Sequence, residues 1–431
     1  MYEINTKLEA LEANGQPIRV SLIGAGQMGK DIIAQVDLMK GMIIPVIVDM
    51  SFELAEKALK EAGHEGEYIK TNDINEAEKA VDAGVLVLTT EISIAILPRK
   101  VDVVIDATGS PEMGAKISLM CINAKKHIVM MNVECDITIG PILMQMAENA
   151  GIVYSLTAGD EPGSIVELYR FATALGFKVV AAGKGKNNPL DIYAVPSQWE
   201  ERAHQRNMSA KMLVEFVDGS KTMIEMAAVS NATGLVPDVR GMHGPKCNVE
   251  DLAKVFSTKE QGGILEKEGV VDYGIGNINP GVFVVVTTDS PRLIDSLVQR
   301  DMGTGPNYLL FRPYHLCSCE TPITAAQAVI YGESTAHPMK YLTSECITVA
   351  KQDLKYGTVL DGIGENCYRA SIELASTARE GKMLPVGLAK GAVLICQVKC
   401  DEVITYDMVK LDDNSTLLQL RRIQDQMLKR S

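Results

Sequence analysis

The sequence lacks several features that would place it in familiar classes of protein. No apolar run reaches the roughly 18–20 residues that a membrane-spanning helix needs. The first residues, from Met1 to Gln16, also lack the basic and then apolar order of a signal peptide. We therefore expect a cytoplasmic protein that has no membrane partner.

Paired cysteines and several catalytic motifs are also missing. The nine cysteines are an odd number and form no Cys-x-x-Cys pair, which is typical of free thiols in a reducing compartment. The chain contains no Gly-x-Ser-x-Gly elbow, no His-Glu-x-x-His helix and no Walker phosphate loop. Hydride transfer is the chemistry that these absences leave.

Positive charge is scarce as well. The chain has 42 Lys and Arg against 55 Asp and Glu, a net charge of −13 that repels polyanions, so we expect no nucleic-acid partner. With 46% apolar and 23% charged residues the composition is that of a globular protein. At roughly 100–200 residues per domain, the length indicates two to four domains.

The first part of the chain carries a dinucleotide-binding pattern. A β-rich run over 18–23 ends in Gly24-Ala25-Gly26-Gln27-Met28-Gly29, and the apolar spacing after it predicts a helix. The glycines allow a tight turn, a close approach to a pyrophosphate and close helix packing. Since the helix start offers unpaired N–H groups, we expect NAD or NADP to bind here, at Gly24, Gly26, Gln27, Met28 and Gly29.

Two further strand ends belong to this predicted cofactor site. Asp49 ends the next strand, where its carboxylate would accept hydrogen bonds from a ribose 2′-OH and repel a 2′-phosphate. Taken alone it favours NAD, and the alternative is that it only caps the following helix. Thr108 and Gly109 follow a strand that ends at Asp106, and we expect them beside the nicotinamide. Asp106 itself is open to a structural or a functional interpretation.

The order of elements predicts the fold class and the domains. Strands at 101–105, 127–131 and 152–156 alternate with helices, which indicates an α/β fold with a doubly wound parallel Rossmann sheet over residues 1–158. Residues 159–319 then show polar, glycine-rich segments between strands predicted at 177–182, 213–217 and 281–286, so we expect a second, α+β catalytic domain. A helix within 320–337 is expected to pack back on the first domain, and 340–431 to form a small β-rich domain.

The candidate catalytic residues come from the second predicted domain. The run from Gly183 to Asp191 places Lys184 and Lys186 on a glycine-bearing loop, where they could meet an anion or a developing oxyanion. We therefore expect a small, anionic substrate, and the alternative is a solvated basic turn. His243, between glycines, is a candidate acid, base or donor, or else a surface turn histidine. Carboxylates could bind Mg²⁺ or Mn²⁺, but no spacing supplies a ligand motif, and the metal stays open.

The chain also resembles two known families. The glycine turn, Asp106-Ala107-Thr108-Gly109 and the strand 127–132 make the first domain similar to homoserine dehydrogenases. Nearly the whole chain resembles the deoxyxylulose-phosphate-reductoisomerase-like proteins, which end in a SAF (β-clip) domain. The stretches that carry this second resemblance are 183–188, 218–222, 231–235, 241–245, 312–316 and 384–388.

The resemblance implies a function and further site residues. It implies reductive isomerisation of a ketose phosphate with NADPH and a divalent ion, in isoprenoid biosynthesis. The preference for NADPH is in tension with Asp49, which favours NAD. The resemblance carries Asn132 over as a nicotinamide-side residue. It implies that Lys184 and Lys186 hold the phosphate or polarise a carbonyl. The residues that would transfer protons or bind the metal are then Asp191, Glu225 or His243. Homoserine dehydrogenases have a catalytic lysine where this chain has Glu134, which argues against homoserine as the substrate.

Two alternatives to this function stay open. One is simple dehydrogenation of an alcohol, as in homoserine dehydrogenases. The other is a non-catalytic protein that senses a cofactor or binds a ligand. In each case we expect a homo-oligomer.

Overall fold

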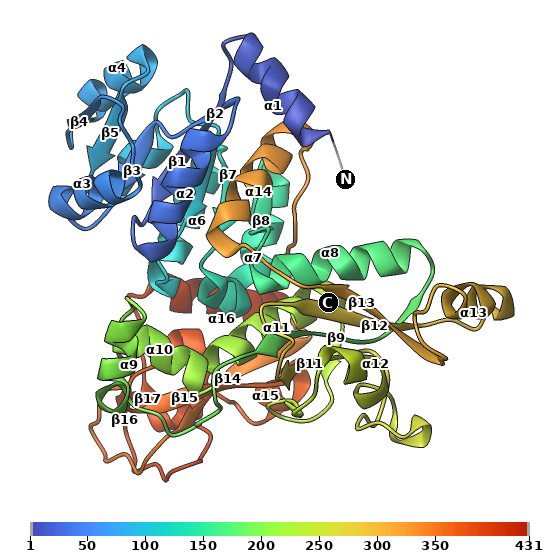
Figure 1. Ribbon diagram of the computed structural model, residues 1–431. Helices are drawn as coiled ribbons and strands as arrows, with labels where there is room; N and C mark the ends of the chain where they lie inside the picture. The colour runs from blue at the N-terminus through green and yellow to red at the C-terminus, as the bar shows by residue number, and fades with distance from the viewer. Residues whose placement is uncertain (1–2, 429–431) are drawn as a thin grey trace. The chain divides into compact units, whose positions relative to one another are not determined.

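The computed structural model describes residues 3–428, which form two compact units. The first unit contains residues up to 163 together with 316–340 and the segment from 420 onward. The second contains 164–315 and 341–419. Figure 1 colours the chain by residue number, so that the return of 316–340 to the first unit is visible in orange.

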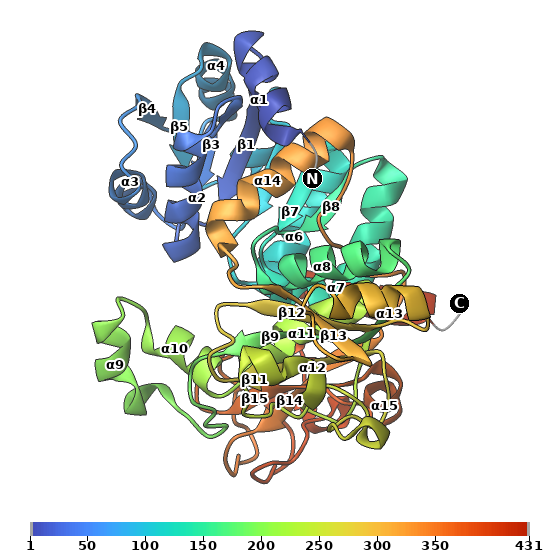
Figure 2. The same ribbon diagram turned by 45° about the vertical axis from the view of Figure 1, so that its right-hand side comes forward.

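The first unit is built on a parallel sheet whose main path runs in the order β4-β5-β3-β1-β6-β7-β8, with β2 paired to β1. Its near-continuous apolar strands are buried, as expected for a sheet with helices on both faces (Figures 1 and 2). The strands are β1 (Ile18–Ile23), β2 (Met42–Ile43), β3 (Val46–Val48), β4 (Tyr68–Lys70), β5 (Leu86–Thr89), β6 (Val103–Asp106), β7 (His127–Met130) and β8 (Tyr154–Leu156). The predicted Rossmann fold is confirmed.

The helices of this unit include one from late in the sequence. The segment expected to return, 320–337, contains most of α14, which packs on α2 and against β6 and β7. The helices are α1 (Ile4–Ala13), α2 (Gln27–Leu38), α3 (Phe52–Glu61), α4 (Ile74–Ala83), α5 (Ile92–Ile96), α6 (Pro111–Ala124), α7 (Val133–Ala150) and α14 (Cys317–Tyr331). Helices α8 (Glu161–Ala174) and α16 (Thr416–Leu428) carry the chain from one unit to the other.

The second unit contains a mixed sheet in the order β10-β11-β9-β12-β13, with β9 parallel to β11 and antiparallel to β12. Its strands are β9 (Lys178–Lys186), β10 (Val236–Pro237), β11 (Val270–Ile275), β12 (Val282–Thr287) and β13 (Asn307–Arg312), with the separate pairs β14 (Ser344–Ala350) and β15 (Tyr368–Leu374), and β16 (Val393–Leu394) and β17 (Val409–Lys410). This mixed sheet agrees with the predicted second α+β part of the fold.

The helices of the second unit lie between these strands in the sequence. They are α9 (Glu200–Gln205), α10 (Ala210–Val217), α11 (Ser220–Thr233), α12 (Leu252–Val255), α13 (Pro291–Val298) and α15 (Ala375–Glu380), with short 3₁₀ turns at Pro196–Gln198, Val249–Asp251, Lys259–Gln261, Val386–Leu388 and Tyr406–Met408. The sequence predicts a separate domain at 340–431, whereas the structure groups 341–419 with the mixed sheet. Helix α11 packs on β14 and β15 as well as on β11, which joins these segments.

Two local predictions in this unit are wrong. The apolar run 213–217 is the end of helix α10, because the Ser209 side chain accepts a hydrogen bond from the backbone N–H of Met212 and caps the helix start. The first part of the predicted glycine-bearing loop from Gly183 to Asp191 is strand, since β9 continues to Lys186. Among the described residues, no helix combines the length and apolar character needed to cross a membrane.

Candidate active site

The glycine turn lies at the carboxyl ends of three neighbouring strands of the first unit. The N–H of Gly24 donates to the carbonyl of Val48, at the end of β3, over 2.9 Å. The N–H of Ala107, after β6, donates to the carbonyl of Ile23, at the end of β1, over 2.8 Å. The turn is therefore fixed at the edge of the sheet where open α/β folds bind ligands.

The glycines in this turn serve the different purposes that their order predicts. Gly24 has a φ of 98°, and a Cβ there would lie 2.6 Å from the carbonyl oxygen of Ala107. A Cβ on Gly29 would collide with the carbonyl oxygen of Gly24, so only a glycine at this position lets α2 pack so close to the turn. Gly26, in contrast, is exposed and a Cβ there would meet no atom within 4 Å.

Gly26 leaves open space at the start of α2. Gly26 is also the N-cap of α2, and within the described chain no side chain caps this helix. Gln27 and Met28 form its first turn, and Gln27 is exposed. The helix start therefore offers backbone N–H groups and the positive end of its dipole to an anion.

Asp49 holds the glycine turn and does not cap the next helix. Its carboxylate accepts hydrogen bonds from the N–H groups of Ala25, at 2.9 Å, and of Met50, at 2.6 Å. The cap of α3 is instead Ser51, whose side chain accepts from Leu54 N–H. The carboxylate of Asp49 thus lies beside the turn that would hold the phosphates, as a ribose-binding acid requires.

A buried network stands behind Thr108 and Gly109. Asp106 is fully buried and accepts hydrogen bonds from the Thr108 hydroxyl at 2.7 Å and from the Asn132 amide at 3.2 Å, and burial raises its pKa. The Asn132 amide also donates to the carbonyl of Ser110, and its oxygen accepts from Cys135 N–H at the start of α7. Asp106 and Asn132 therefore support the Thr108 turn from within, while Gly109 is exposed.

Lys184 and Lys186 lie on one face of the central strand β9. They are only 5% and 4% exposed, so neither forms a solvated basic turn. Gly183 and Gly185 point to the opposite face, where a Cβ on Gly185 would clash with the backbone of Asn279. The alternation of glycine and lysine gives the strand one face for close backbone packing and another that carries two amines.

Helix α11 supplies an acid to these lysines. Glu225 is 1% exposed and its carboxylate forms an ion pair with the Lys184 amine. The Lys186 amine donates to the backbone carbonyl of Phe216, at the end of α10. Burial, followed by the charge of Lys184, lowers the pKa of Lys186 to about 8, against the opposing effects of Asp218 and Glu225. The cluster thus contains an amine that changes protonation near neutral pH.

The other two predicted residues lie elsewhere in the second unit. Asp191 is exposed and accepts a hydrogen bond from Tyr193 N–H, so it stabilises a turn. The His243 Nδ1 is 2.8 Å from the carboxylate of Asp272, and this hydrogen bond raises the pKa of His243. Asp272 precedes Tyr273, the register partner of Lys184. Its side chain therefore points to the face of the sheet opposite the lysines.

Two buried acids near the candidate residues were missed from the sequence. Asp272 is fully buried in β11 and also accepts from the N–H of Gly244. Asp218 is 2% exposed and pairs with Lys351. The sequence held a signal in both cases. Asp272 is an acid within an apolar strand, and Lys351, the partner of Asp218, is a lysine directly after one; both placements are unusual. Their partners, however, are distant in the sequence.

Comparisons with known proteins bear on the enzyme class. Residues 159–321 match the family described as Oxidoreductase DRL, catalytic domain. No curated protein matches the chain by sequence. The match confirms the expectation of an oxidoreductase, and the Rossmann sheet of the first unit agrees with a nicotinamide cofactor.

Solved structures with a similar course of the chain include several dehydrogenases. One is a probable dehydrogenase from Thermotoga maritima, 12% identical with a TM-score of 0.42, where the match covers 74% of this chain and 90% of that chain. Another is a myo-inositol dehydrogenase from Corynebacterium glutamicum, 10% identical with a TM-score of 0.41, covering 73% and 89%.

Proposed function

We propose that this protein transfers a hydride between NAD(P) and a small, anionic, hydroxylated carbonyl compound, such as a sugar phosphate. The observation that carries the proposal is the buried pair of amines on β9, with Glu225 beside one of them. Burial of three ionisable groups costs free energy, and perturbed groups of this kind cluster at catalytic sites. The matched oxidoreductase family covers this cluster.

The first unit binds the cofactor, which supplies or accepts the hydride. The backbone N–H groups that begin α2 bind the pyrophosphate, for which the exposed Gly26 leaves room. Asp49 accepts hydrogen bonds from the ribose hydroxyls, which favours NAD over NADP. Thr108 and Gly109 line the nicotinamide side, and Asn132 acts through its support of Thr108.

The second unit supplies the charge and the proton that a carbonyl group needs. Lys184, held by Glu225, attracts the anionic group of the substrate. Lys186 is protonated below a pKa of about 8 and donates a proton to the carbonyl oxygen as the hydride arrives at carbon. In the oxidation direction the neutral amine accepts the proton of the hydroxyl.

Coupled isomerisation is the finer form of this proposal. The resemblance to the reductoisomerase-like family supports it, and that chemistry adds a divalent ion. Glu134 is buried in the first turn of α7, at the position where homoserine dehydrogenases have a catalytic lysine, which disfavours the simple dehydrogenase alternative.

The test is a substrate panel with the purified chain. NADH or NADPH is mixed with sugar phosphates, polyols and hydroxy acids, with and without Mn²⁺, and both nucleotide oxidation and carbon connectivity of the product are followed. We expect carbonyl reduction to slow as the pH rises through about 8, because Lys186 loses its proton. Lys186→Met should abolish this pH dependence. Cofactor binding without turnover across the panel would instead support the non-catalytic alternative.

A further inference from the structure

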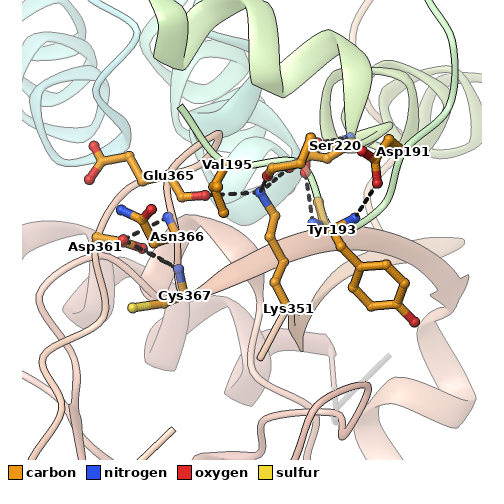
Figure 3. A network of polar contacts seen from close by, with 12 residues as sticks. Asp191, Tyr193, Val195, Ser220, Lys351, Asp361, Glu365, Asn366 and Cys367 are labelled. Atoms are coloured by element: carbon orange, nitrogen blue, oxygen red, sulfur yellow. Dashed lines mark hydrogen bonds and ion pairs between the residues drawn. The ribbon is translucent and has the colours of Figure 1, made fainter. Parts of the chain in front are cut away.

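The amine of Lys351 is buried beneath the turn that joins α10 to α11. It lies 2.6 Å from the carboxylate of Asp218, and the two side chains are 1% and 0% exposed. It also donates hydrogen bonds of 2.9 Å to the carbonyls of Ala194 and Glu365. The ammonium group of Lys351 is therefore held by one ion pair and two hydrogen bonds. Figure 3 shows the side chain reaching toward the segment that carries Ser220.

Asp218 fixes the turn from which the lysine cluster is held. Its other carboxylate oxygen accepts from Ser220 N–H over 2.8 Å, at the start of α11. The Ser220 hydroxyl in turn accepts from the N–H of Ala370, in β15, over 2.9 Å. Phe216, whose carbonyl accepts the hydrogen bond of Lys186, lies two residues before Asp218. Lys351 and Ala370 therefore hold the turn that follows the Phe216 carbonyl and begins α11, the helix of Glu225.

We propose that Lys351 is a positioning residue of the Lys184–Lys186 cluster, which neutralises Asp218 and holds the turn that supplies the acceptor of Lys186. The proposal rests on the proposed function of Lys186. It also gives residues 341–419 a role, since Lys351 follows β14 directly.

The charges around Lys186 set the direction of the expected effect. Lys184 lowers the pKa of Lys186, while Asp218 and Glu225 raise it. When Lys351 is present, the negative charge of Asp218 is largely balanced by the Lys351 amine that pairs with it. When Lys351 is lost, that charge acts on Lys186 without a competing cation, and Lys186 should hold its proton to higher pH.

The experiment measures the titration of Lys186 directly. The full chain is labelled with ¹³C at the lysine ε-carbons, the Lys186 signal is assigned by its loss in Lys186→Arg, and its shift is followed against pH. In Lys351→Met we expect the midpoint to rise by about one pH unit, the lower end of what a nearby opposite charge produces. Lys351→Arg keeps the charge and should stay close to the wild type. Lys351→Met combined with Asp218→Asn should cancel the rise.

The readout does not depend on catalysis, so it is separate from the test of the proposed function. If Lys351→Met does not fold, Asp218→Asn alone decides, because loss of an acid should lower the Lys186 midpoint. A folded Lys351→Met with an unchanged or lowered midpoint would overturn the proposal. So would an Asp218→Asn variant whose Lys186 midpoint equals that of the wild type.

Discussion

Breaking the ion pair between Lys184 and Glu225 from one side should strongly destabilise the second unit. The side chains are 6% and 1% exposed, so both charges of the pair lie away from solvent. Breaking such a pair from one side costs roughly 3–5 kcal/mol, whereas removal of both members should cost less than the sum of the two single changes, because neither charge is left behind. The pair can therefore be measured by comparing single and double variants.

The variants are Glu225→Gln, Lys184→Met and the two combined. We expect each single change to lower the free energy of unfolding by about 3 kcal/mol or more. The double variant should lose less than the sum of the singles, with a coupling free energy of about 2 kcal/mol, toward the upper end of the range for residues in direct contact. Lys178→Met is the matched control, because its pair with Asp289 is exposed and should contribute less than about 1 kcal/mol.

The chain has a built-in probe for this measurement. Its single tryptophan, Trp199, lies in the second unit and packs against a buried cluster that includes Leu213 and Val214 of α10. Urea unfolding followed by tryptophan fluorescence therefore reports on the unit that contains the ion pair. Single variants that lose less than about 1 kcal/mol, as at a surface pair, would show that the two charges are not held together in a buried site.

Three further predictions concern the cofactor turn and His243. Gly26→Ala should keep the fold, since its Cβ meets nothing, but weaken nucleotide binding in calorimetry, whereas Gly24→Ala should destabilise the protein itself. Asp49→Ala should weaken NADH binding about tenfold or more and reduce the preference for NADH over NADPH. Asp49→Asn is the control, because it keeps an acceptor for the N–H of Ala25. The hydrogen bond to Asp272 raises the pKa of His243. The contact between protonated His243 and Asp272 therefore stabilises the folded protein fully below about pH 6.5, and this contribution is lost as the pH rises through the raised pKa of His243. His243→Asn should therefore cost more stability at about pH 5.5 than at about pH 9, and equal costs would contradict this assignment.

The Rossmann unit could be predicted because its signals are local. Apolar strands, the spacing of three glycines and the acid at 49 all lie within a short stretch, and each has a direct structural consequence. The role of Asn132 was less accessible from the sequence. The resemblance carries it over as a nicotinamide-side residue, whereas its amide is occupied by Asp106 and Ser110.

The two lysines of the predicted catalytic loop were given the wrong local structure. Glycine is rare in strands, so the run Gly183 to Lys186 reads as a loop. The alternation has the period of a strand, and the glycines fit where neighbouring backbone approaches, that of Asp272 at Gly183 and that of Ile278 and Asn279 at Gly185. The partners Glu225 and Lys351 are brought to the cluster by long-range packing of α11 on β14 and β15, which no local pattern shows.

The burial of the two lysines itself favours a reactive role over a structural one. If the cluster served only stability, apolar side chains of similar size would stabilise β9 equally or better, because an ion pair inside a protein must offset the desolvation of both charges. Here the chain also buries Lys186, whose hydrogen bond goes to a carbonyl and whose pKa is lowered to about 8. A protein that needs only a packed strand has no use for an amine in that state. An enzyme that moves a proton to and from oxygen near neutral pH does.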